Sequence, residues 1–142
     1  MKNLVLGFLF AGIASTASIA SAENFTCDFS RGGAGGWVRP EIFLKIDSAS
    51  GKAFVADDIT WQNKKGWHNA RLAGDTDNRY VVTWSVKSGL SASHQRINKM
   101  DYRVSFSKKN NKANARMTPV GYANEFSTHG TCKPAKPPKA LR

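Results

Sequence analysis

Apolar and polar residues alternate with a period of two through most of this chain, and no segment shows a sustained period of 3.6. In 42–46, 80–86 and 100–106, every second position is apolar. Such alternation is typical of strands that bury one face and leave the other in water. The chain is therefore predicted to be all-β.

Clusters of Gly, Asn, Asp and Ser separate the alternating runs, as expected for turns. We expect seven or eight strands, at about 24–30, 37–47, 52–57, 59–62, 67–73, 78–87, 97–107 with 113–118, and 120–128. An antiparallel meander of this size limits its exposed edges by closing as a small barrel or by folding as a two-sheet sandwich. The sequence leaves both architectures open and favours the barrel if the two ends are joined.

Residues 1–22 have the features of a signal peptide. Lys2 precedes an apolar run at 4–13, and small residues end at Ala22. The run is ten residues long, whereas a membrane span needs about 20. We therefore expect cleavage before Glu23, a periplasmic or secreted location, and no transmembrane segment in the mature chain.

The mature chain then divides into one β domain at 23–132 and a tail at 133–142. The full chain carries a net charge of +11, and loss of the signal peptide removes one lysine and no acid, which leaves +10. The tail holds four basic residues, three prolines and no acid. This composition predicts an extended, disordered arm.

Cys27 and Cys132 are the only cysteines, and they lie near the two ends of the mature domain. In an oxidising compartment they are expected to form a disulfide that closes a loop of 106 residues. A loop of this length gives roughly 4 to 5 kcal/mol of stabilisation in chain-entropy terms. A metal site or reactive thiol is disfavoured because the chain has no Cys-x-x-Cys pair. No metal or cofactor is predicted.

The excess of positive charge indicates an anionic partner, either a polymer or an envelope surface. Basic side chains are expected on the wet face of the hairpin formed by 97–107 and 113–118, and at its tip. The face residues are Lys99, Arg103 and Arg116, and the tip residues are Lys108, Lys109 and Lys112. The leading hypothesis is an exported binding module without catalytic activity.

Trp61 and Trp67 flank a polar, basic segment and form a second candidate contact, because aromatic and basic side chains together can bind a sugar or a nucleotide. The alternative, which the sequence favours, is a hairpin whose ends are held by cross-strand aromatic contacts.

A small hydrolytic enzyme is the alternative from another class. Its site would combine histidines with the only adjacent acid pair, Asp57 and Asp58, and would form only in the folded chain. No local motif supports an enzyme. The three histidines lie in separate segments and form no His-x-His or His-Glu-x-x-His motif, and the chain has no Gly-x-Ser-x-Gly motif for a nucleophilic serine. The histidines are His68, His94 and His129.

Five segments together resemble a group of small, exported bacterial proteins without an assigned activity. They are Phe25-Thr26-Cys27-Asp28-Phe29, Gly36-Trp37-Val38-Arg39-Pro40, Thr83-Trp84-Ser85-Val86-Lys87, Asp101-Tyr102-Arg103-Val104-Ser105, and the ending from Gly121-Tyr122-Ala123-Asn124-Glu125-Phe126 to Gly130-Thr131-Cys132-Lys133. The resemblance implies export and a two-cysteine frame, and it supplies no catalytic residue. A second likeness, to periplasmic lysozyme-inhibitor barrels, conflicts with charge, since cationic lysozymes would be repelled.

Overall fold

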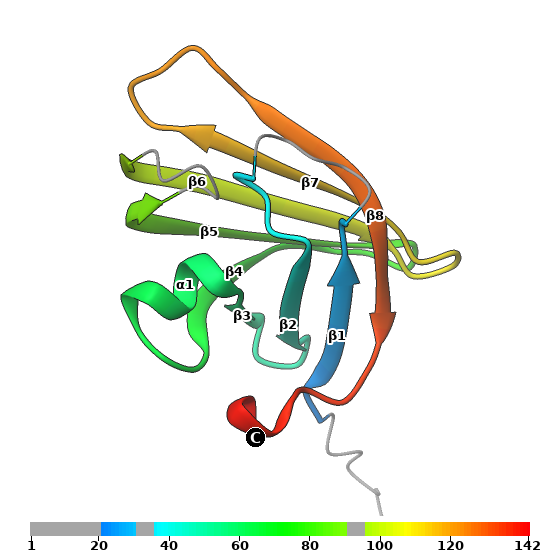
Figure 1. The fold of residues 1–142 in the computed structure, drawn as a ribbon. Helices are drawn as coiled ribbons and strands as arrows, with labels where there is room; N and C mark the ends of the chain where they lie inside the picture. The colour runs from blue at the N-terminus through cyan, green and yellow to red at the C-terminus, as the bar shows by residue number, and fades with distance from the viewer. Residues whose placement is uncertain (1–20, 31–35, 91–95) are drawn as a thin grey trace, which may run out of the picture.

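Eight antiparallel strands close into a barrel in which each strand pairs with its neighbours in sequence and β8 returns to β1 (Figure 1). The computed structural model describes residues 21–30, 36–90 and 96–142. The strands are β1 (Glu23–Asp28), β2 (Glu41–Asp47), β3 (Lys52–Ala56), β4 (His68–Asp75), β5 (Arg79–Leu90), β6 (Arg96–Ser107), β7 (Lys112–Pro119) and β8 (Phe126–Pro134). The all-β prediction is confirmed, and the barrel is the architecture that forms.

The predicted signal peptide lies almost wholly outside the described residues.

The inward-facing residues of the alternating strands fill the barrel with one hydrophobic core. At one level, Phe25, Tyr80 and Phe106 pack together with ring centroids 4.9 to 5.6 Å apart. At another, the rings of Trp84 and Tyr102 stack 5.2 Å apart and nearly parallel. The outward-facing residues of the same strands are left to solvent, so they are the ones available for contact with a partner.

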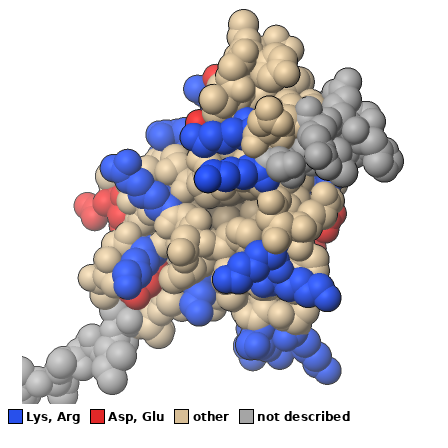
Figure 2. Space-filling model, turned by 90° about the vertical axis from the view of Figure 1, so that its left-hand side faces the viewer, with Lys and Arg blue, Asp and Glu red and all other residues tan. Residues whose placement is uncertain are grey.

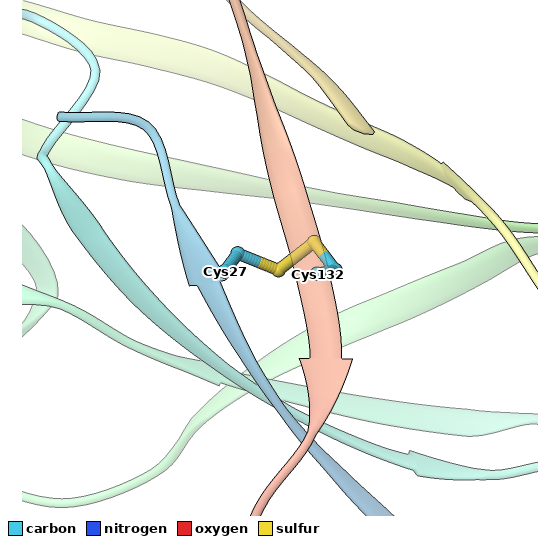
Figure 3. Close-up of a disulfide and its surroundings, with 2 residues drawn as sticks. All are labelled: Cys27 and Cys132. Carbon is cyan, nitrogen blue, oxygen red and sulfur yellow. A yellow bond between two sulfur atoms is a disulfide. The ribbon is translucent and has the colours of Figure 1, made fainter. Parts of the chain in front are cut away.

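The disulfide between Cys27 and Cys132 joins β1 to β8 at the seam where the barrel closes (Figure 3). The two cysteines lie directly opposite each other in the register, and both side chains are fully buried. The predicted bridge is therefore confirmed. It forms here because closure of the meander brings its first and last strands side by side.

Residues 59–62 were predicted as a strand, and this is wrong, because they belong to the helix α1 (Asp58–Asn63). Asp57 caps the helix: its Oδ1 accepts a hydrogen bond of 2.7 Å from the backbone N–H of Thr60, and the Thr60 hydroxyl pairs with the backbone N–H of Asp57. This reciprocal pairing stabilises a helix start without any long period of 3.6. In the described part of the chain, no helix has the length and apolarity needed to span a membrane.

The last strand runs from Phe126 to Pro134, and not over 120–128 as predicted. The residues before it form a connection in which Gly121 has a φ of +91° and Tyr122 is 64% exposed. A positive φ interrupts an extended strand and favours glycine. The alternation of apolar residues at 120–126 therefore marks an exposed loop.

The basic C-terminal segment was predicted to be disordered, and the structure instead places it against the barrel. Lys133 and Pro134 extend β8, the N–H of Ala135 donates to the carbonyl of Asn24, and a short 3-10 helix, η1 (Lys139–Leu141), follows. Leu141 is only 8% exposed. Burial of the Leu141 side chain favours the docked position, although the prolines and charged residues around it favour an extended arm in water.

Candidate functional site

Antiparallel pairing places four basic residues in one line across the outside of the barrel. Lys52 on β3 lies opposite Arg71 on β4, Arg71 opposite Thr83 on β5, Thr83 opposite Arg103 on β6, and Arg103 opposite Arg116 on β7. We call Lys52, Arg71, Arg103 and Arg116 the basic row. Since neighbouring strands lie about 4.8 Å apart, the row spans roughly 19 Å.

A hollow of about 620 Å³ lies along three members of the basic row, over β4 to β7. We call this hollow the arginine groove. Its charged lining residues are Arg71, Lys99, Arg103, Arg116 and a single acid, Asp101, and its neutral polar lining residues are Asn69, Thr83, Ser85 and Thr118. The face drawn in Figure 2 is rich in Lys and Arg side chains around a central hollow, with fewer Asp and Glu side chains.

The cations of the arginine groove differ in how far they are neutralised. Arg116 Nε lies 3.2 Å from Glu125 Oε1, and Lys99 Nζ lies 3.5 Å from Asp101 Oδ1. Within the described residues, no carboxylate forms an ion pair with Arg71 or Arg103. The direct opposition of Arg103 and Arg116 is an unfavourable like-charge pair, and an anion between them would relieve it.

The structure thus brings together Lys99, Arg103 and Arg116 as residues of one groove, although their function remains a proposal. It separates them from the three lysines at the hairpin tip, which begin five residues, or about 16 Å, beyond Arg103 along β6. All three tip lysines are exposed. Sequence reasoning missed Lys52 and Arg71, because each lies in an expected strand but nothing in the sequence fixes its partner across the sheet.

Lys108 has a structural partner. Its Nζ lies 2.5 Å from Asp75 Oδ1 and 3.9 Å from the centroid of the Tyr80 ring. The pKa of Asp75 is lowered by the hydrogen bond from Lys108, and more weakly by one from Ser48. Lys108 therefore ties the hairpin tip to the β4–β5 turn and is less available to a partner than Lys109.

Neither of the two candidate tryptophans lines the arginine groove. Trp61 is on α1, and Trp67 immediately precedes β4, so the hairpin expected between them does not form. The indole N–H of Trp67 donates to the carbonyl of Leu141 at 2.9 Å, and Trp61 lines a smaller hollow with Leu141. The chain's own C-terminal segment therefore occupies the surface between the two rings.

The residues of the alternative hydrolytic site are not brought together in the part of the molecule that the structure describes. Asp57 is 6% exposed and caps α1; its pKa is raised by burial, against the lowering effect of hydrogen bonds from Thr60. His68 Nε2 lies 2.8 Å from the carbonyl of Lys64, and His129 on β8 faces Asn114. His94 lies outside the described residues. Over the described ranges, no three His, Cys, Asp or Glu side chains form a group that could hold a metal ion.

Comparison of the chain with protein-family models, with curated proteins and with solved structures finds no match.

Proposed function

We propose that this protein is an exported binding module without catalytic activity, and that its partner is an anionic polymer held in the arginine groove. Three observations support this proposal. The basic row crosses five adjacent strands, two of its arginines have no acidic partner among the described residues, and the hollow beside it is lined by residues of four adjacent strands, β4 to β7.

The single observation that carries the proposal is the direct opposition of Arg103 and Arg116. Like charges opposite each other in a sheet are destabilising, and Glu125 pairs with Arg116 alone, which leaves Arg103 without an acidic partner among the described residues. Nothing in the packing of the barrel core requires the two arginines, because both side chains point outward. Guanidinium groups bind carboxylate, sulfate and phosphate groups through two parallel hydrogen bonds. We therefore assign this pair and Arg71 to ligand contact.

The proposal is tested by titrating the disulfide-bonded protein, residues 23–142, into fluorescein-labelled heparin fragments over a range of NaCl concentrations. The logarithm of the affinity is expected to fall linearly with the logarithm of the salt concentration, because each neutralised charge releases counterions. Replacing two groove arginines, R71Q/R103Q, is expected to flatten the slope by up to about two units.

The matched control is K133Q/K136Q, which removes the same charge from the end of β8 and the segment after it, outside the lining of the arginine groove. This control is expected to retain most of the affinity. Equal weakening by both double variants would show that only net charge matters and would overturn the assignment to the groove. Salt-insensitive or absent binding of heparin would overturn the proposed function, and capture by vesicles of anionic lipid in its place would indicate a surface as the partner.

A further inference from the structure

The arginine groove contains a second line of side chains, parallel to the basic row and different in chemistry. Ser85 on β5 lies opposite Asp101 on β6, and Asp101 lies opposite Thr118 on β7. We call these three residues the hydroxyl row. On each strand, the hydroxyl-row residue lies two positions from Thr83, Arg103 or Arg116, so the two rows run about 7 Å apart. A ligand in the groove therefore meets three cations along one side and the hydroxyl row beside them, with Lys99 beyond Asp101 at the far edge.

Asp101 is the residue that most restricts the ligand. Its Oδ1 accepts a hydrogen bond of 2.6 Å from the Ser85 hydroxyl and also contacts Lys99. Its Oδ2 has no hydrogen-bond partner among the described residues, and the side chain is about half exposed. A carboxylate at this point repels any anionic group that lies against it, whereas it accepts a hydrogen bond from a neutral ligand hydroxyl.

Aromatic side chains provide little stacking surface in the arginine groove. Its two aromatic lining residues, Trp84 and Tyr102, are 6% and 3% exposed because their rings point into the barrel. Phe54, opposite Asn69, faces the adjoining hollow and has Lys45 Nζ 5.9 Å from its centroid. Proteins that bind single-stranded nucleic acids stack successive bases on successive rings. Phe54 and Trp67, which share Lys45 over their rings, lie outside the groove lining and do not offer such a series along it.

We infer that the ligand is an acidic polysaccharide, in which each sugar carries a carboxylate and free hydroxyl groups. This inference rests on the proposed function, which it makes more specific. The carboxylates bind the basic row, and the hydroxyls of the same sugars donate to Asp101 and exchange hydrogen bonds with Ser85 and Thr118. The two parallel lines of unlike chemistry match a sugar ring that has charged and uncharged polar groups on different edges.

The test compares two linear polyanions, hexagalacturonate and linear hexaphosphate, by calorimetric titration at one NaCl concentration. The phosphate chain carries the higher charge, so charge alone would make it the tighter ligand. The uronic acid chain has ring hydroxyls and the phosphate chain has none along its length. We expect the wild-type protein to bind hexagalacturonate about tenfold more tightly than the phosphate chain, because one hydrogen bond from a sugar hydroxyl to the charged Asp101 contributes about that factor.

The decisive variant is D101N, which removes the negative charge and preserves the size of the side chain. It is expected to strengthen phosphate binding several-fold and to weaken uronate binding, so that the preference falls below about threefold. The control is D77N, which makes the same change of charge at an exposed residue of the β4–β5 turn, outside the groove lining. It is expected to leave the preference at about tenfold.

The outcomes separate the two proposals. If the phosphate chain binds the wild-type protein as tightly as the uronate chain, or if D101N leaves the preference unchanged, the polysaccharide inference is wrong and the proposed binding of an anionic polymer stands. If neither ligand nor heparin binds, the proposed function is wrong as well. Loss of the preference in D101N with its retention in D77N would support the inference.

Discussion

Removal of the disulfide is the perturbation whose effect on stability is most directly calculated from the structure. The bridge closes a loop of 106 residues, from Cys27 to Cys132. The chain-entropy relation for this loop gives a loss of about 5 kcal/mol in the free energy of unfolding at 25 °C. Small domains have total stabilities of about 5 to 15 kcal/mol, so the loss is a third or more of the whole. The seam between β1 and β8 depends on it most, since only four residue pairs connect these strands.

The assay is equilibrium unfolding in urea, with the oxidised protein compared with its reduced form and with C27A/C132A. Alanine is preferred to serine because both positions are fully buried, and a buried hydroxyl without a partner would add a separate cost. We expect the midpoint to fall by about 2 M urea or more. The reduced protein keeps both sulfur atoms, so its agreement with the alanine variant would isolate the effect of the covalent loop. A loss below about 1 kcal/mol would refute the reasoning.

Three further predictions concern packing outside the groove. Gly130→Ala should lower the free energy of unfolding by about 2 kcal/mol or more in urea titrations, because its Cβ would overlap the carbonyl oxygen of Asp28. Lys108→Ala should lower it by about 1 kcal/mol and Lys109→Ala by less than about 0.5 kcal/mol, since only Lys108 contacts Asp75. The pKa of Asp75 is lowered in the folded state, so this difference should be present at neutral pH and disappear as the pH falls below about 4. Truncation before Pro138 should shift tryptophan emission to longer wavelength and lower the stability by about 1 to 2 kcal/mol, because it removes Leu141; unchanged emission would contradict the observed packing.

The strands were predictable because alternation is a local property, whereas the arrangement of the basic row was not. Alternation tells which residues of one strand share a face, but the residue opposite depends on the register. Between β4 and β5 the register shifts at a bulge between Leu72 and Gly74. If the register of Gly74 and Asp75 continued through the strand, Arg71 would lie opposite Trp84 and out of line with Arg103. The bulge therefore aligns Arg71 with Thr83 and Arg103, and no motif in the sequence predicts this alignment.

The other errors have physical causes of the same local kind. The helix α1 has six residues, too few for a period of 3.6 to be recognised, and its only signal is the capping pair of Asp57 and Thr60. The C-terminal segment has the composition of a disordered arm. Its apolar residue Leu141 is nevertheless buried, and its backbone carbonyl accepts a hydrogen bond from Trp67, a residue far away in the sequence. Composition describes the average behaviour of a segment and does not reveal one specific contact.

The position of the disulfide also determines how the domain responds to mechanical force. Cys27 and Cys132 face each other close to the two ends of the barrel, so only short segments of β1 and β8 and the C-terminal segment of the domain lie outside the covalent loop. Tension applied between the ends first loads the pairs outside the loop, Phe25 with Pro134 and Thr26 with Lys133. It then passes through the sulfur–sulfur bond, so the strand pairing inside the loop carries none of it. A chain attached at one end and pulled at the other would therefore keep its groove intact. Reduction would transfer the same load to the four residue pairs of the β1–β8 seam, and the barrel would open there first.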